Sequence, residues 1–187
     1  QSAGSSVQLS YNANTNRLTG DFSGVADGLY TVRVAASDLA GNQAVTREMQ
    51  VYVDRIAPTV ATRSDAGNLV ISADGASNFD RALVTIATPS ASEAPMDATT
   101  ADVYAASDVS RLTSLGTLTY SAATGRFSGN LGNTNTFPDG NYAIVVHVRD
   151  TAGNVTDQSL GLTIDRQPPT IDLDAVATDG IINASEA

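Results

Sequence analysis

The stretch DGNYAIVVHVRDTAGN, residues 139–154, decides the fold. Every second residue from Tyr142 to Val148 is apolar, and this period of two predicts a β-strand with one buried face. Asp-Gly before the strand and Ala-Gly-Asn after it are turn signals. The stretch therefore predicts one strand of an antiparallel sheet, with solvent on its other face.

The same pattern occurs 112 residues earlier, as DGLYTVRVAASDLAGN at residues 27–42. A third shared motif, Val/Ile-Asp-Arg-x-x-Pro-Thr, follows at Val53–Thr59 and again at Ile164–Thr170. Repetition with a period near 111 residues indicates a tandem array. It predicts three parts, namely the C-terminal part of one repeat (1–54), a complete repeat (55–166) and the start of a third (167–187). We do not expect the 54 residues of the first part to bury a stable core alone, so either a partner segment completes it or the sequence is cut from a longer protein.

The complete repeat is expected to form about seven short antiparallel strands. Turn signals bound these strands near 57–63, 68–73, 82–88, 115–120, 125–131, 141–149 and 156–164. Residues 89–114 are rich in Ala, Ser, Thr and Asp and are expected to form a long excursion with one short strand near Val103. No segment has a sustained helical stripe. The fold class is therefore all-β, with tandem immunoglobulin-like β-sandwiches in which Asp-Gly-x-Tyr forms a tyrosine corner.

The ordered motifs Asp-Gly-x-Tyr, Asp-x-Ala-Gly-Asn and Val/Ile-Asp-Arg-x-x-Pro-Thr resemble the bacterial Ig-like repeats of giant surface adhesins, of the biofilm-associated and repeats-in-toxin types. The resemblance covers essentially the whole chain, and residues 179–187 are similar to the opening of a further repeat. It implies an extender module, and many such modules bind calcium at their junctions.

Composition limits the possible partners. The 187 residues carry a net charge of −10, which excludes nucleic acid or an anionic membrane surface as the main partner. The absence of Cys excludes disulfides, thiolate metal sites and a cysteine nucleophile. No apolar run approaches the ~20 residues that span a membrane.

The strand order also predicts a calcium site where successive repeats meet. If strands alternate in direction, Asp54 approaches Asp150 at one junction, with Asp74, Asn78 or Asp80 nearby. At the next junction, Asp165 would meet Asn183 or Glu186 of the third repeat. Clustered carboxylates repel one another unless they are neutralised, and Ca²⁺ takes six to eight oxygen ligands. The predicted metal ligands are therefore Asp54, Asp74, Asp80, Asp150, Asp165 and Glu186.

A plainer alternative stays open for the same residues. Asp before a turn commonly accepts a hydrogen bond from its own backbone, so Asp-x-Ala-Gly-Asn is also typical of a hairpin loop without a metal. The neighbours Asp54-Arg55 and Asp165-Arg166 could form surface ion pairs of small energetic value.

No catalytic constellation is evident, so an enzyme is not expected. The single histidine, His147, is predicted on the outward face of its strand, and no Gly-x-Ser-x-Gly, phosphate-binding loop or His-Glu-x-x-His motif occurs.

The sequence thus predicts a stalk segment of a large secreted adhesin on the bacterial cell surface. Its partners would be neighbouring repeats of the same chain, calcium would stiffen their junctions, and other domains would bind a cell-surface or glycan ligand in adhesion or biofilm formation. The alternatives are a glycan- or protein-binding module, with Tyr104 as the only aromatic of the excursion, and a filament subunit that exchanges strands between chains.

Overall fold

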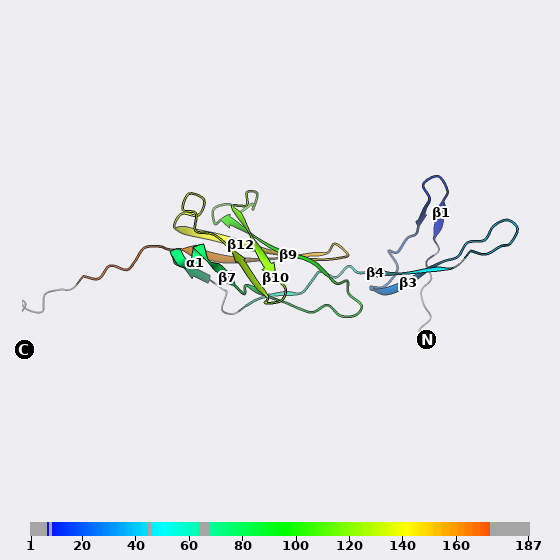
Figure 1. The fold of residues 1–187 in the computed structure, drawn as a ribbon, viewed down its shortest axis with the longest axis horizontal. Coiled ribbons are helices and arrows are strands. Elements are labelled where there is room, and N and C mark those ends of the chain that lie inside the picture. The colour runs from blue at the N-terminus through cyan, green and yellow to red at the C-terminus, as the bar shows by residue number, and fades with distance from the viewer. Residues whose placement is uncertain (1–6, 8, 45, 64–67, 173–187) are drawn as a thin grey trace, which may run out of the picture.

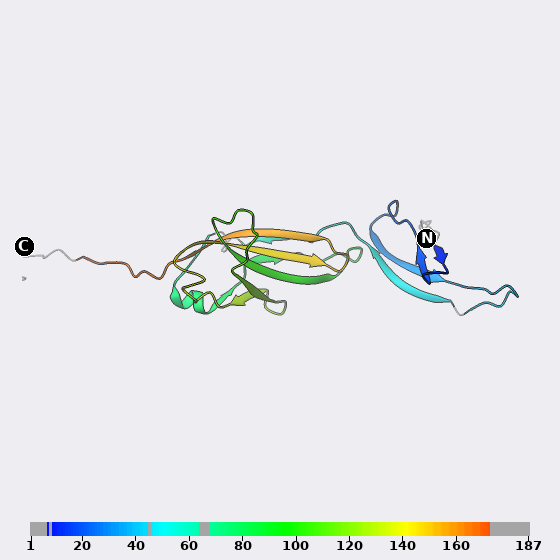
Figure 2. The ribbon, with the colours of Figure 1, turned by 90° about the horizontal axis from the view of Figure 1, so that it is seen from above.

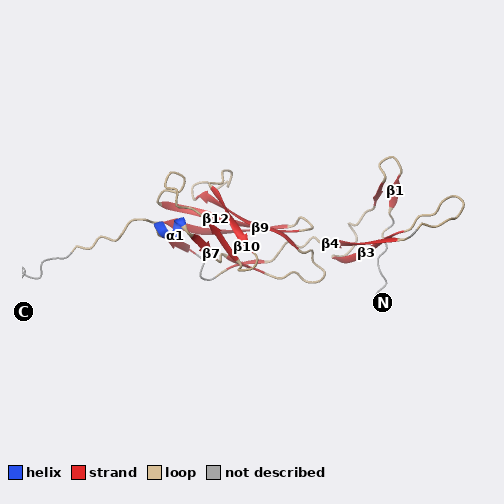
Figure 3. Ribbon diagram, in the orientation of Figure 1, coloured by secondary structure: helices blue, strands red, loops and turns tan. Residues whose placement is uncertain are grey.

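The computed structural model describes residues 7, 9–44, 46–63 and 68–172, and its regular structure is almost entirely β (Figure 3). Two units follow each other along the longest axis (Figures 1 and 2). The first contains β1 (Ser10–Asn12), β2 (Arg17–Thr19), β3 (Gly28–Val34) and β4 (Arg47–Val53). The second contains β5 (Val60–Thr62), β6 (Asn68–Ile71), α1 (Ala73–Ser77), β7 (Phe79–Arg81), β8 (Val84–Ile86), β9 (Met96–Ala105), β10 (Gly116–Ser121), β11 (Arg126–Gly129), β12 (Gly140–Asp150) and β13 (Val155–Ile164).

The complete unit is an immunoglobulin-like β-sandwich. Its main sheet has the order β6-β13-β12-β9-β10-β11-β7, and β5 pairs with β8 in a second ladder. Residues 116–119 of β10 pair with β9, while residues 119–121 pair with β11. Strand β10 therefore turns the corner between the two layers, and the sheet curls around one core.

The core consists of the inward face of each layer. Strand β12 contributes its alternating apolar residues, as the period of two predicted, and β7, β10 and β11 supply the opposite wall. The largest fully buried side chains include Phe79, Phe127, Leu118, Ile144 and Leu162. Burial of these side chains is the main favourable term for the fold.

A tyrosine corner forms in both units, as predicted. The Tyr142 hydroxyl donates to the Pro138 carbonyl oxygen at 2.6 Å, and the Tyr30 hydroxyl donates to Ala26 at 2.8 Å. Burial raises the pKa of the Tyr142 hydroxyl.

Residues 89–114 were predicted as a long excursion with one short strand near Val103, and the structure has a strand there that is much longer. Residues Met96–Ala105 form β9, a central strand between β12 and β10. Only Ala101 and Val103 supply fully buried apolar groups near its middle, and Thr and Asp fill half of the other positions. The alternation is present, but small and polar residues hide it from a count of apolar side chains.

The path at the start of the complete unit also differs from expectation. The stretches near 57–63 and 68–73 were predicted as antiparallel neighbours, but β5 pairs with β8 and β6 pairs in parallel with β13. This part of the chain starts at Pro58, which is bonded to Thr156 at the start of β13, and reaches Ile71, opposite Ile164 at the end of β13, so β5 and β6 run in the same direction. A short helix, α1, follows β6 where only a turn was expected, and Ser72 caps it by accepting a hydrogen bond from Gly75 N–H.

The first unit forms two separate hairpins in the described residues. Strands β1 and β2 make one two-stranded sheet, and β3 and β4 make another. The inward residues of β3 are only partly buried, whereas those of its equivalent β12 are buried. None of the described helices is long and apolar enough to cross a membrane.

Candidate functional site

An arginine clamp closes the last turn of each unit. Arg166 follows β13, and its guanidinium donates to Asp139 at 2.7 Å and to the Leu131 carbonyl oxygen at 3.3 Å. Its side chain is only 14% exposed, so the ion pair is shielded from solvent on the arginine side. Asp139 belongs to the Asp-Gly-x-Tyr motif and Arg166 to the Val/Ile-Asp-Arg motif, so the clamp is a contact between the first and third repeated motifs. The prediction of ion pairs between adjacent Asp and Arg residues was wrong.

The first unit repeats this clamp. Arg55 donates to Asp27 and to the carbonyl oxygens of Val25 and Phe22. The same motif positions therefore form an Asp–Arg clamp at the C-terminal end of each unit.

The Asp-x-Ala-Gly-Asn loop of the complete unit is fixed by a buried carboxylate. Asp150 is 2% exposed, and its two oxygens accept hydrogen bonds from the backbone and the side-chain amide of Asn154, both at 2.9 Å. Gly153, at φ 96°, supplies the left-handed residue that the loop needs. The Asn154 amide also donates to the Asp54 carbonyl oxygen at 3.2 Å, so the loop reaches the linker between the units.

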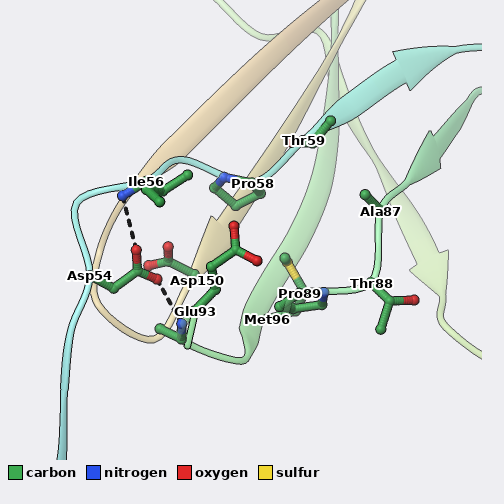
Figure 4. Close-up of a pocket in the computed structure, with 11 residues that line it drawn as sticks. Asp54, Ile56, Pro58, Thr59, Ala87, Thr88, Pro89, Glu93, Met96 and Asp150 are labelled. Carbon is green, nitrogen blue, oxygen red and sulfur yellow. Dashed lines mark hydrogen bonds between the residues drawn. The ribbon is translucent and has the colours of Figure 1, made fainter. Parts of the chain in front are cut away.

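Asp54 lies at the centre of this junction. One carboxylate oxygen accepts from Ile56 N–H at 2.9 Å, and the other accepts from Ala94 N–H of the complete unit at 2.6 Å (Figure 4). The Thr156 hydroxyl donates to the Pro58 carbonyl oxygen at 2.6 Å, so the linker is also held at Pro58. The chain segment that leaves the first unit is therefore bonded directly to the second.

The corresponding loop in the first unit shows which of these bonds are local. Asp38 accepts from Asn42 N–H at 2.8 Å and from the Asn42 side chain at 2.7 Å, although it is exposed. These bonds lower the pKa of Asp38. The shape of this loop is thus supported by its own local hydrogen bonds.

Three carboxylates line one small cavity at the junction. The cavity has a volume of about 40 Å³, and Asp54, Glu93 and Asp150 lie around it together with Pro58 and Met96 (Figure 4). Glu93 was not predicted from the sequence, because it lies in the segment that was taken for an excursion. Its carboxylate accepts from Ser90 N–H, and this bond lowers its pKa.

The donor set of the cavity does not form a ready calcium shell. Asp54 and Asp150 each use both carboxylate oxygens to accept N–H hydrogen bonds, and one oxygen of Glu93 does the same. Within the described ranges, no three or more His, Cys, Asp or Glu residues are grouped so that they could hold a metal ion. The geometry therefore favours a hydrogen-bonded junction, and calcium here stays a prediction.

The other predicted ligands lie elsewhere. Asp74 is in α1, at the opposite end of the unit from Asp54, and accepts from Asn78 at 2.9 Å. Asp80 is in β7 and pairs with Arg126 at 2.6 Å. The expectation that Asp74 or Asp80 lies near Asp54 was wrong, because β5 and β6 run in the same direction.

The predicted second junction is described only in part. Asp165 lies at the same end as α1, where its N–H donates to the Ile71 carbonyl oxygen and its carboxylate accepts from Gln167 N–H at 2.9 Å. Its predicted partners, Asn183 and Glu186, lie outside the described residues.

Two further side chains have structural partners. Tyr104 is 8% exposed under Arg111, so it is not the exposed platform that a glycan site would use. Burial, with Asp102 and Asp108 nearby, raises the pKa of Tyr104. His147 is partly exposed on the outward face of β12, as expected, and lies 2.7 Å from Asp157.

The clamp makes stability depend on pH. Hydrogen bonds from Arg166 hold the pKa of Asp139 below its ordinary value of 3.8. A carboxyl with a lowered pKa stabilises the folded state above its unfolded pKa, and this contribution disappears as the pH falls through the folded pKa. We expect Asp139→Asn to lower the melting temperature at neutral pH, and the difference from wild type to shrink below about pH 4. Circular-dichroism melts at several pH values test this, and a difference of constant size down to about pH 2 would contradict it.

The fold and the repeated junction motifs define a tandem β-sandwich protein whose units are joined end to end. Two family models, both described as bacterial Ig-like domains, match residues 68–166 and 1–55. The first match alone covers more than half of the 187 residues, so the chain belongs to the bacterial Ig-like domain family.

Several solved structures are similar to the chain. CopC from Methylosinus trichosporium OB3b is 9% identical, with a TM-score of 0.39, over 61% of this chain and 99% of that one. A 1.5-MDa bacterial ice-binding adhesin is 21% identical, with a TM-score of 0.36, over 84% of this chain and 49% of that one. A Ca²⁺-stabilized adhesin of an Antarctic bacterium is 23% identical, with a TM-score of 0.32, over 84% of this chain and 37% of that one. The chain thus matches less than half the length of either adhesin structure. No curated protein matches the sequence.

Proposed function

We propose that the chain is a non-catalytic extender segment of a bacterial cell-surface adhesin, in which each Ig-like unit is fixed end to end on the next. The observation that carries this proposal is the hydrogen bond from Ala94 of the complete unit to the Asp54 side chain of the preceding linker. A stalk holds its tip away from the cell only if its units do not bend freely relative to one another. A short linker that is hydrogen-bonded to the next unit restricts this bending more than a flexible linker does.

Two further observations support the role. Pro58 restricts the linker backbone, and its carbonyl oxygen is bonded to Thr156 of the complete unit. The net charge of −10 keeps a long array soluble and opposes edge-to-edge association of its sheets. Secretion, adhesion and a contribution to biofilms are parts of this proposal.

The junction is tested by comparing Asp54→Ala with Asp165→Ala. Both variants lose the same local turn bond, to Ile56 and Gln167 respectively, but among the described residues only Asp54 also bonds the next unit. A charge-assisted bond of this kind contributes about 1–2 kcal/mol. We expect Asp54→Ala to broaden the distance distribution in small-angle X-ray scattering and Asp165→Ala to leave it unchanged. Equal distributions for both variants would contradict the proposed junction.

Calcium is the second part of the same test. Three carboxylates around one cavity favour a cation, whereas their existing N–H partners make a cation unnecessary for the observed geometry. A junction held by hydrogen bonds alone would give wild-type scattering and melting that are the same in about 1 mM Ca²⁺ and in chelator. A rise in melting temperature with Ca²⁺ that Asp54→Ala removes would instead establish calcium as the stiffening element.

A further inference from the structure

The outward face of the main sheet carries an imidazole between two carboxylates. His147 of β12 lies directly opposite Asp157 of β13, and its Nδ1 atom is 2.7 Å from a carboxylate oxygen of Asp157. On the other side, Asp102 of β9 pairs with Val145, two residues before His147, so the imidazole and the Asp102 side chain are diagonal neighbours. Three adjacent strands therefore each contribute one side chain to this cluster.

Hydrogen bonds orient the imidazole and the Asp102 carboxylate and leave one atom of each without a bond. A neutral imidazole that donates its Nδ1 hydrogen to Asp157 keeps a lone pair on Nε2. Oδ1 of Asp102 accepts from the hydroxyls of Thr117 at 2.6 Å and Ser114 at 3.2 Å. Oδ2 of Asp102 faces Nε2 at 3.6 Å, which is longer than a hydrogen bond. Among the described residues, neither Nε2 nor Oδ2 has another hydrogen-bond partner.

The distance between Nε2 and Oδ2 is close to one edge of a tetrahedral metal site. Zinc binds imidazole nitrogen and carboxylate oxygen at about 2.0–2.2 Å, which places two ligands about 3.4 Å apart in a tetrahedron. Asp157 contacts the other ring nitrogen, which is how a carboxylate orients a metal-bound histidine. Two carboxylates beside a neutral imidazole also carry a net negative charge, which favours a dication.

We propose that His147 Nε2 and Asp102 Oδ2 bind a divalent transition-metal ion of the zinc class, with water in the remaining positions. The site offers two protein ligands, so it is smaller than the groups of three or more that the described residues lack. The side chains of His147 and Asp102 are 31% and 25% exposed, so water can reach both. An imidazole ligand favours zinc-like ions over calcium, which prefers oxygen ligands. Ala35 occupies the position equivalent to His147, so the first unit does not repeat this site.

Zinc titration of the 187-residue chain, without a polyhistidine tag, tests the proposal. We expect one Zn²⁺ per chain by isothermal titration calorimetry, and a melting temperature that rises with Zn²⁺ concentration because the ion binds the folded state. The chain has a single histidine, so its ring-nitrogen NMR signals report the site directly. Zn²⁺ should shift the Nε2 signal and leave Nδ1 protonated. Excess Ca²⁺ should not displace Zn²⁺, which separates this site from the carboxylates of the junction.

Variants separate the two ligands from the residue that orients one of them. Asp157→Ala removes the carboxylate behind the imidazole and should weaken Zn²⁺ binding by about 10–100-fold. His147→Gln and Asp102→Asn each remove a ligand and should weaken binding at least as much. Asp97→Asn is the matched control, since Asp97 is an exposed acid of β9 that pairs with Arg149, and its affinity should stay within about threefold of wild type.

Three results would overturn the proposal. Absence of calorimetric Zn²⁺ binding would assign the cluster to an ion pair between a protonated imidazole and its two carboxylates. Equal binding by His147→Gln would mean that the ion lies on carboxylates elsewhere in the chain. A Zn²⁺-dependent shift at Nδ1 in place of Nε2 would show that Asp157 does not orient the imidazole for the metal.

Discussion

Asp150→Ala is expected to lower the melting temperature of the complete unit by about 10 °C. The variant removes two charge-assisted hydrogen bonds from a carboxylate that is 2% exposed, which costs about 2–4 kcal/mol. It also releases the Asn154 side chain, whose amide donates a hydrogen bond to the Asp54 carbonyl oxygen in the linker. Relief of repulsion between Asp150 and Asp54 offsets only part of this loss, because both carboxylates already accept N–H hydrogen bonds.

The matched control for this variant is Asp38→Ala. Asp38 makes the same local bonds to Asn42, but it is exposed and lies in the first unit. We expect no change in the main calorimetric transition, which reports the complete unit. Asp150→Asn is a second comparison, since its amide offers one acceptor where the carboxylate offers two, and its loss should approach that of Asp150→Ala. A loss below about 1 kcal/mol for Asp150→Ala would show that burial of this carboxylate is of little consequence.

The strands that could be predicted from the sequence are those with large apolar residues at alternate positions. Strands β12 and β13 were placed within a residue or two, because Tyr, Ile, Val and Leu mark one face. Strand β9 was predicted only as a short strand near Val103, because Ala101 and Val103 are its only fully buried apolar residues. Propensity alone does not identify a central strand whose neighbours on both sides supply the burial.

The meeting of Asp54 and Asp150 was predicted correctly, but by an argument with two errors. The sequence analysis counted β5 and β6 as two passes across the sandwich, although they run in the same direction, and it omitted the pass made by β9. The two errors cancel for every strand after β9. They do not cancel for Asp74, which is why it was placed at the wrong end.

The clamp and Glu93 could not be predicted by the same means. The Asp139–Arg166 pair joins two motifs that are 27 positions apart, and only their joint recurrence in Asp27–Arg55 signals a contact. Glu93 has no equivalent in the first part of the chain, so the repeat gave no signal for it.

Val103→Asp is expected to unfold the complete unit. Val103 is fully buried in β9, between β12 and β10, and an unpaired carboxylate there costs several kcal/mol. That cost is comparable with the total stability of a domain of this size, about 5–15 kcal/mol. Because β9 joins the two layers of the sheet, its loss should leave separate hairpins like those of the first unit.

The control and the readout make this prediction specific to the strand. Thr100→Asp adds the same charge to an exposed position of β9, and we expect it to change the melting temperature by no more than about 2 °C. Hydrogen exchange of Val103→Asp should show lost protection in β10, β12 and β13 together, since all three depend on the position of β9. If Val103→Asp keeps a cooperative transition within about 5 °C of wild type, residues 96–105 are a loosely held segment and the sandwich closes without them.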